Sequence, residues 1–203
     1  MKTETIELND TSISIPHAES YRDCITLIKS DWYRRSGREE SIMAIAMKSL
    51  RPFGFSLLFW LRLCQYKGWL YPFCRFMHLR ACRRQQIQMS PTMRIGYGFY
   101  IGHSNSMVIN ADTIIGNNVN LSPFLSIGSN HKSPAVIGDN VYVGPHVCLV
   151  EHVRIGNNAT IGAGAVVTKD VPENATVAGV PAKVLHYDHP GRYVNRRWPL
   201  DNH

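Results

Sequence analysis

An apolar residue recurs about every six positions through the second half of this 203-residue chain, and this spacing constrains the fold more than any other feature. The recurring positions are Met89, Ile95, Ile101, Ile109, Ile115, Leu121, Ile127, Ile137, Val143, Leu149, Ile155, Ile161 and Val167. Another small or apolar residue follows four places later at Val119, Val141, Val147, Val153, Ala159 and Ala165. A helix requires a period near 3.6, and a lone strand a period of 2. A period of six with two inward positions instead indicates short strands joined by tight bends, three to a triangular coil, with stacked coils sharing one apolar column.

The register of this repeat slips twice. It slips by two residues at "HSNSM" and by four within "GSNHKSPAV". Each slip should push a loop out of the coil, and the two loops carry His103 and His131. Because loops on a rigid scaffold are where chemistry tends to be placed, both histidines are candidate functional residues. His146 and His152 fall at the same place in successive units, and we expect them to stack on one edge.

The chain before the repeat has a different composition, rich in aromatic residues, cysteines and arginines. We therefore expect a helical region over residues 1–86, a repeat domain over residues 87–185 and a tail over residues 186–203. Helical spacing marks residues 18–37, 41–50 and 56–82, with breaks near Pro52, Gly68 and Pro72 and a stop at Gly37. The sequence leaves open whether the tail covers a ligand or a neighbouring subunit.

Charge and cysteine content indicate where the protein works. The formal net charge is +7, and residues 41–111 contain no acidic residue. Basic residues interleaved with Trp, Phe and Leu suit an anionic membrane surface, although a solvated basic face would show the same pattern. No nucleic-acid module is recognisable. Five scattered cysteines without a CxxC pair, a polar N-terminus and an apolar run of only ten residues (52–61) predict a cytoplasmic protein, at most peripheral on the membrane.

Two stretches resemble a known family. They are "IGHSNSMVINADTIIGNNVNL" (residues 101–121) and "IGNNATIGAGAVVTKDVPENATVAGVPAKVL" (residues 155–185). Both resemble the hexapeptide-repeat acyltransferases of the serine O-acetyltransferase branch. They are closer still to the acetyltransferases of colanic acid and capsule biosynthesis, which share "VIN" after the histidine loop and "IQ" before the first coil. The resemblance covers about residues 86–185. It implies a mainly β fold, a left-handed parallel β-helix with an N-terminal α-helical region, which assembles as a homotrimer and uses acetyl-CoA as acyl donor without a metal.

The resemblance also assigns roles to individual residues. It places His103 at the catalytic histidine and Gln88 where the serine enzymes carry an Asp that orients that ring. A Gln can fix the tautomer of the ring but brings no charge. The residues implied for coenzyme A are Pro145, Ala163 and Gly164 along the pantetheine arm, and Lys169 and Lys183 for the phosphates. The residues implied for the acceptor are His131 and Asn110. Solvated loop or coil positions are the alternative for His131 and both lysines.

The chemistry implied is direct acyl transfer. A neutral imidazole can take the proton of an acceptor hydroxyl as it attacks a thioester and return it to the departing thiolate. Direct transfer requires no Ser or Cys nucleophile and forms no acyl-enzyme. No GxSxG elbow is present, and the histidine spacing forms no compact metal motif. The serine enzymes carry an Asp before the histidine where this chain has Gly102, and they carry a Gly-Glu pair where it has Asn110-Ala111. These losses favour a hydroxyl of a cell-surface polysaccharide or its lipid-linked precursor. A serine O-acetyltransferase of cysteine biosynthesis and a non-catalytic scaffold remain the alternatives.

Overall fold

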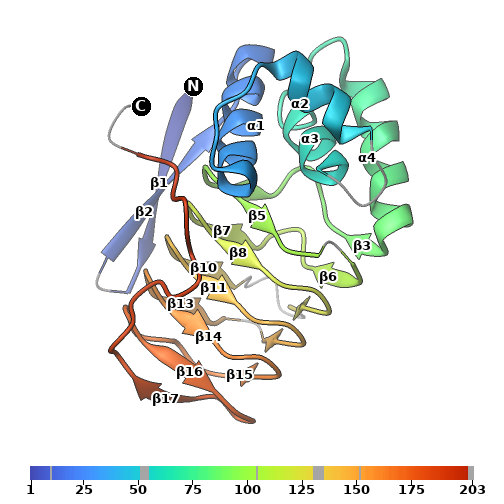
Figure 1. The fold of residues 1–203 in the computed structure, drawn as a ribbon. Coiled ribbons are helices and arrows are strands. Elements are labelled where there is room, and N and C mark those ends of the chain that lie inside the picture. Colours follow the sequence, from blue (N-terminus) through green and yellow to red (C-terminus); the bar gives the residue numbers. More distant parts are fainter. Residues whose placement is uncertain (10, 51–54, 104, 130–134, 151, 201–203) are drawn as a thin grey trace.

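The protein is a triangular prism of stacked coils, closed at its N-terminal end by a helical cap (Figure 1). The computed structural model describes residues 1–9, 11–50, 55–103, 105–129, 135–150 and 152–200. Two strands, β1 (Lys2–Leu8) and β2 (Thr11–His17), form an antiparallel hairpin before the cap. The cap consists of four helices, α1 (Tyr21–Ser36), α2 (Ile42–Ser49), α3 (Ser56–Leu63) and α4 (Tyr71–Gln85).

Three parallel sheets form the sides of the prism. The β3 sheet contains β3 (Ile87–Gln88), β6 (Met107–Ile109), β9 (Ser126–Ile127), β12 (Cys148–Leu149) and β15 (Val166–Val167). The β4 sheet contains β4 (Arg94–Ile95), β7 (Ile114–Ile115), β10 (Val136–Ile137) and β13 (Arg154–Ile155). The β5 sheet contains β5 (Tyr100–Ile101), β8 (Asn120–Leu121), β11 (Tyr142–Val143), β14 (Thr160–Ile161) and β16 (Thr176–Ala178), with β17 (Lys183–His186) added antiparallel.

The predicted apolar column is confirmed. Every recurring position of the six-residue repeat is buried, and so is each of the six small or apolar positions four places later. Equivalent residues of successive coils pair in register, as Ile101 does with Leu121 and Leu121 with Val143. Each buried aliphatic side chain contributes on the order of 1.5–3 kcal/mol, so this register resists slipping.

Asparagines build the edge between the β4 and β5 sheets. Asn118, Asn140, Asn158 and Asn174 all have positive φ, between 56° and 62°. Asn tolerates this left-handed backbone better than other non-glycine residues. The Asn140 side-chain amide donates to Asn158 Oδ1 at 3.2 Å, and Asn158 donates to Asn174 at 3.1 Å. The "GNN" and "GDN" bends of the sequence therefore form a hydrogen-bonded ladder along this edge.

The helices end where the sequence places their signals. Ser20 caps α1 by accepting a hydrogen bond from Asp23 N, and Gly37 ends it with φ +71°. Pro72 lies in the first turn of α4, so it begins this helix and does not interrupt one. The helical spacing over residues 18–37 and 41–50 is confirmed, and the long stretch over residues 56–82 divides into α3 and α4.

Two sides of the prism are covered by the chain itself. The N-terminal hairpin, which the sequence analysis did not predict, packs Leu8, Ile13 and Ile15 against Ile114 and Val136 of the β4 sheet. The C-terminal tail runs from β17 along the β5 sheet towards the N-terminal hairpin (Figure 1). Its contacts include a hydrogen bond from the Asn120 side-chain amide to the Tyr193 carbonyl (2.9 Å) and one from Trp198 N to Asn118 Oδ1 (2.7 Å). The tail thus packs on its own subunit.

The third side is uncovered by the described part of the chain. The outward residues of the β3 sheet are exposed at Gln88, Val108, Ser126 and Cys148. Val108, at the centre of β6, has 47% of its surface exposed. This bare side adjoins the edge that carries His103.

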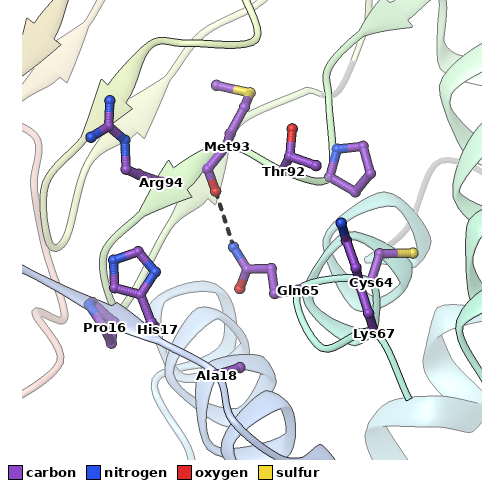
Figure 2. Close-up of a pocket in the computed structure, with 10 residues that line it drawn as sticks. Pro16, His17, Ala18, Cys64, Gln65, Lys67, Thr92, Met93 and Arg94 are labelled. Carbon is purple, nitrogen blue, oxygen red and sulfur yellow. Dashed lines mark hydrogen bonds between the residues drawn. The ribbon is translucent and has the colours of Figure 1, made fainter. Parts of the chain in front are cut away.

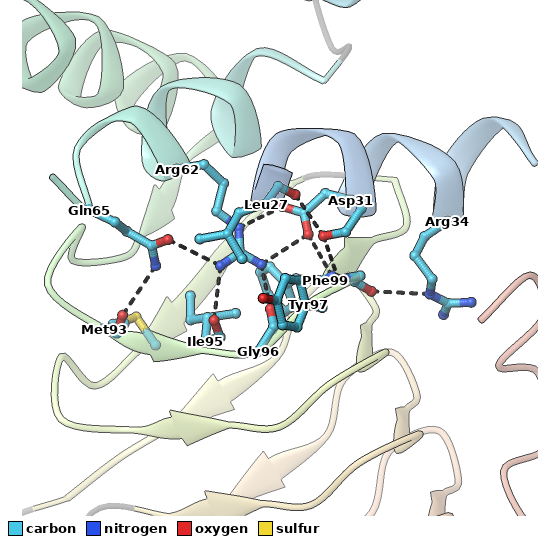
Figure 3. A network of polar contacts seen from close by, with 12 residues as sticks. Leu27, Asp31, Arg34, Arg62, Gln65, Met93, Ile95, Gly96, Tyr97 and Phe99 are labelled. Atoms are coloured by element: carbon cyan, nitrogen blue, oxygen red, sulfur yellow. Dashed lines mark hydrogen bonds and ion pairs between the residues drawn. The ribbon is translucent and has the colours of Figure 1, made fainter. Parts of the chain in front are cut away.

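A buried ion pair attaches the cap to the first coil (Figure 3). Arg62 of α3 donates to both carboxylate oxygens of Asp31 in α1, at 2.7 and 2.9 Å, and both side chains are fully buried. Arg62 also donates to the carbonyls of Ile95 (2.9 Å) and Gly96 (2.6 Å). Asp31 accepts from Phe99 N at 2.7 Å. Two helices and the open end of the β-helix therefore meet at one guanidinium–carboxylate pair.

Replacing one partner of this pair should be costly. Asp31→Asn leaves the guanidinium of Arg62 buried without a counter-charge, and we expect the free energy of unfolding to fall by about 3 kcal/mol or more. Urea denaturation followed by circular dichroism measures the change. Glu39→Gln, an exposed change of the same chemistry, is the control. Equal stability of the two variants would contradict a stabilising role for the Asp31–Arg62 ion pair.

Candidate functional site

The bends that lead from the β5 sheet into the β3 sheet form one straight edge, which we call the histidine edge. Its residues are His103, Phe124, Pro145, His146, Ala163 and Gly164. Backbone hydrogen bonds join successive bends: Phe124 N donates to the Asn105 carbonyl (3.4 Å), His146 N to Pro123 (3.1 Å) and Gly164 N to Pro145 (2.8 Å). The edge therefore brings His103 into line with three of the residues predicted to contact coenzyme A.

His103 is presented by the first slip of the register. It is exposed and has φ +48°. The loop behind it is attached to the end of α4, because Ser106 N donates to the Gln85 carbonyl (3.0 Å) and Met107 N to the Gln86 carbonyl (3.2 Å). Ser106 Oγ also donates to Gln86 Oε1 at 3.0 Å. The two extra residues thus lift the imidazole out of the coil on an anchored loop, where a neutral ring can exchange protons with a bound molecule.

Gln88 lies on β3, next to the same loop. Its side chain faces outward from the β3 sheet, and its backbone pairs with Val108 of β6. Within the described structure, the Gln88 and His103 side chains are not hydrogen-bonded to each other. Catalytic hydrogen bonds are often long in unliganded enzymes, so this geometry leaves the orienting role of Gln88 as a prediction.

The lower part of the histidine edge is open to solvent at its small residues. A Cβ built on Gly164 would meet no atom within 4 Å, and Ala163 is exposed. The bends of His103 and Gly164 are three coils apart, which is about 14 Å at the usual spacing of paired strands. Pro145 has no N–H, and its carbonyl already accepts from Gly164. This bend therefore offers no backbone donor from Pro145 or Gly164, and the fit to a pantetheine arm rests on shape.

The two lysines occupy different edges. Lys183 pairs with Ala178 at the end of the β5 sheet, and the adjoining turn is held by a hydrogen bond from Ala182 N to the Val166 carbonyl (2.8 Å). This places Lys183 at the lower end of the histidine edge, where it could meet a phosphate as a point charge. Lys169 follows β15 and lies at the far side of the β3 sheet. The structure thus brings one predicted lysine, not both, to this edge.

Of the two predicted acceptor contacts, the structure places only Asn110, and it does not bring this residue to His103. Asn110 lies at the edge between the β3 and β4 sheets, where its Oδ1 accepts from Asp112 N at 2.9 Å and closes a local turn. His131 lies outside the described residues.

The expected stacking of His146 and His152 is wrong. His146 stacks on Phe124, with ring centroids 4.6 Å apart and an interplanar angle of 14°. His152 follows β12 and lies at the next edge of the prism. One six-residue unit is one side of the triangle, so vertical neighbours are a whole coil apart and successive units are not neighbours. Phe124, which sequence reasoning missed, is found by counting in whole coils, which aligns "SPF", "GPH" and "GAG" in the three bends below His103.

A hollow of about 520 Å³ opens beside Gln88. It is lined by Arg75, Leu79, Cys82, Arg83, Gln86, Ile87, Gln88 and Met89. Its walls are the outer side of α4 and the start of the β3 sheet. The charge pattern of the sequence pointed to this region without placing it beside the candidate site.

A second hollow, of about 250 Å³, lies on another edge of the first coil (Figure 2). His17, Lys67 and Arg94 line it. Glu4 accepts from His17 at 2.8 Å and from Arg94 at 3.2 Å, and these partners, His17 first, hold the pKa of Glu4 below its usual value. The positive charge of this hollow is therefore partly neutralised. The hollow lies at the bend from β3 to β4, on a different edge from His103.

The chain is similar to acetyltransferases. Residues 134–169 match the family described as bacterial transferase hexapeptide (six repeats). The galactoside O-acetyltransferase of Escherichia coli strain K12 is 36% identical over 107 residues, which make up 46% of this chain and 53% of that protein. The chain thus spans about half the length, or less, of the curated relatives it matches.

Two solved structures share the fold. The serine acetyltransferase of Neisseria gonorrhoeae in complex with serine has a TM-score of 0.66 at 28% identity, covering 80% of this chain and 69% of that chain. The serine acetyltransferase of Brucella abortus strain S19 in complex with coenzyme A has a TM-score of 0.63 at 25% identity, covering 81% and 67%. These similarities confirm the predicted left-handed β-helix and the resemblance to hexapeptide-repeat acetyltransferases. The closer likeness to colanic acid and capsule enzymes remains a prediction.

The described residues contain neither a membrane-spanning helix nor a metal-binding cluster. No helix there has both the length and the apolar character needed to cross a bilayer. No three His, Cys, Asp or Glu side chains within that part of the chain converge as a metal site.

The position of Asn110 can be tested by stability. Asn110→Ala removes the oxygen that closes the turn and should cost about 1 kcal/mol, whereas Asn110→Asp keeps it and should cost less. Urea denaturation compares the two variants. If Asn110→Ala is as stable as Asn110→Asp, the turn does not need this side chain. Asn110 would then again be a candidate for contacting an acceptor.

Proposed function

We propose that the protein is an acetyl-CoA-dependent O-acetyltransferase in which His103 is the general base. The observation that carries the proposal is the histidine edge. An exposed imidazole stands on an anchored loop at one end of this edge, and the bend three coils below it carries the exposed small residues Ala163 and Gly164. Similarity to a galactoside O-acetyltransferase and to serine acetyltransferases supports the same reaction class.

The mechanism follows from the place of His103. Its neutral ring accepts the proton of the acceptor hydroxyl while that oxygen forms a bond to the carbonyl carbon of the acetyl thioester. The carbon–sulfur bond then breaks, and the ring returns the proton to the departing thiolate. The products are an acetyl ester and free coenzyme A. His146 and Gly164 already use their N–H groups within the edge, so these two groups are not free to donate to the developing oxyanion.

For the acceptor we propose a hydroxyl of a cell-surface glycan or of its lipid-linked precursor. Gly102 stands before the histidine, so no carboxylate there can pair with an amino acid's ammonium group. A site without that partner discriminates against a zwitterion. The alternative, serine O-acetylation, draws on the similarity to serine acetyltransferases.

We propose a homotrimer built on the bare side of the prism. The hairpin covers the β4 sheet and the tail covers the β5 sheet, whereas the β3 sheet exposes Val108 at 47%. With the other two sides covered, the β3 sheet is the side left for another subunit to pack on. Because this side adjoins the histidine edge, a neighbouring subunit packed there would wall the site.

We propose that the protein works at the cytoplasmic face of an anionic membrane, which it contacts peripherally. Trp69 and Leu50 of the cap are 82% and 73% exposed, within the segment that carries no acidic residue. Apolar and basic side chains exposed together suit a lipid interface.

Removing the base tests the function. His103→Ala should lower acetyl-CoA-dependent transfer by about 10²-fold or more, because general-base catalysis contributes about that factor. Release of free coenzyme A is measured with a galactoside or an oligosaccharide as acceptor. His152→Ala, an exposed histidine on another edge, is the matched control.

The same assay separates the candidate acceptors. Turnover with saccharides but not with L-serine supports the glycan, and turnover with L-serine alone supports the alternative. A His103→Ala variant as active as the His152→Ala control would overturn the proposal.

Gln88 is proposed as a positioning residue for His103. Gln88→Glu puts a carboxylate beside the ring and favours its protonated form, so the acid limb of the kcat/KM profile should move to higher pH. Gln88→Ala should lower kcat without moving that limb. An unchanged profile in Gln88→Glu would mean that residue 88 does not act through the histidine.

A further inference from the structure

Two adjoining hollows follow the outer side of α4 and reach Gln88 at the start of the β3 sheet. One hollow of about 740 Å³ is lined by Phe76, Leu79, Arg80, Arg83 and Arg84. The hollow of about 520 Å³ beside Gln88 shares Leu79 and Arg83 with it. We call the two together the α4 groove.

The groove is strongly basic. Arg75, Arg80, Arg83 and Arg84 line it, and none of the described residues that line it is acidic. His78, behind Arg75, does not add to the charge, because burial lowers its pKa to about 4, with Arg75 adding to the shift. Arginine forks bind phosphate oxygens in pairs. The charge of the groove therefore complements a phosphorylated ligand.

The groove also exposes apolar side chains between its arginines. Phe76 is 62% and Leu79 39% exposed, although both lie on a helix whose other side is well buried. Phosphate alone would not use these side chains. A ligand with an anionic group next to a hydrocarbon chain would use both.

The groove adjoins the His103 loop. Gln85 and Gln86, at the end of α4, hold the His103 loop through Ser106 and Met107. Arg83 precedes Gln86 by three residues, roughly 4.5 Å along a helix axis. A phosphate held at Arg83 would thus place the group attached to it beside Gln88 and His103.

We propose that the α4 groove binds the acceptor as a lipid-linked saccharide phosphate, an inference that rests on the proposed function. Arg75 and Arg83 hold the phosphate, Phe76 and Leu79 contact the hydrocarbon chain, and the saccharide extends towards Gln88. This assigns the substrate to the lipid-linked class and gives the basic cap a role in recognising it.

Farnesyl diphosphate is a soluble probe for this site. Its dissociation constant is measured by isothermal titration calorimetry with the full-length protein, alongside inorganic pyrophosphate and farnesol. We expect the complete probe to bind more tightly than either half. Arg83→Gln should weaken its binding roughly tenfold or more, the loss of one charged hydrogen bond. Arg22→Gln, on the exposed side of α1, should bind as the wild type does.

The outcomes separate this inference from the proposed function. A His103→Ala variant that binds the probe but transfers no acetyl group is expected if both hold. Equal affinity of Arg83→Gln and the control would overturn the groove. So would binding to phosphatidylglycerol vesicles without binding to farnesyl diphosphate, which would make this surface a membrane contact only. Self-association that buries α4 and blocks the probe would also overturn it.

Discussion

The structure depends on the stacking of two inward side chains from every six-residue unit. Ile101, Leu121 and Val143 pair in register and exclude water from the column, so a coil cannot absorb extra residues on its inner side. Any insertion must leave through an edge. His103 occupies such an insertion, and its position above Phe124 and His146 follows from the column as much as from the loop. The packing of the core thereby determines where a catalytic group can be presented.

A β-helix must also close its open end, and the pair formed by Asp31 and Arg62 does this. The guanidinium satisfies two backbone carbonyls of the first coil that have no coil above them, and the carboxylate accepts from Phe99 N. Burying both charges costs desolvation energy, which the complete set of hydrogen bonds offsets. The helix that carries Arg62, α3, also packs against α4, whose end holds the His103 loop. The cap therefore contacts the histidine edge as well as the open end of the first coil.

Much of this architecture could be predicted from the sequence, because repetition makes one local pattern hold for the whole domain. The buried column, Gly37 as a helix end and the exposed place of His103 all follow from local spacing. The local signal for the hairpin, the alternation of Ile6, Leu8, Ile13 and Ile15, was not used in the sequence analysis. That alternation still would not say which sheet the hairpin covers. The docking of Trp198 on Asn118 is a tertiary contact without periodicity. His146 and His152 were misplaced because the unit of stacking is a coil, not a hexad. Whether Gln88 meets His103 depends on side-chain positions that no spacing determines.

The central claim is that a thioester binds along the histidine edge with its carbonyl at His103. A crystal structure of the protein with coenzyme A tests it most directly. The account predicts that the pantetheine arm passes Pro145, Ala163 and Gly164 and that the thiol sulfur lies within hydrogen-bond reach of the His103 ring. Coenzyme A bound along the Asn110 edge, or with its thiol directed away from that ring, would contradict it.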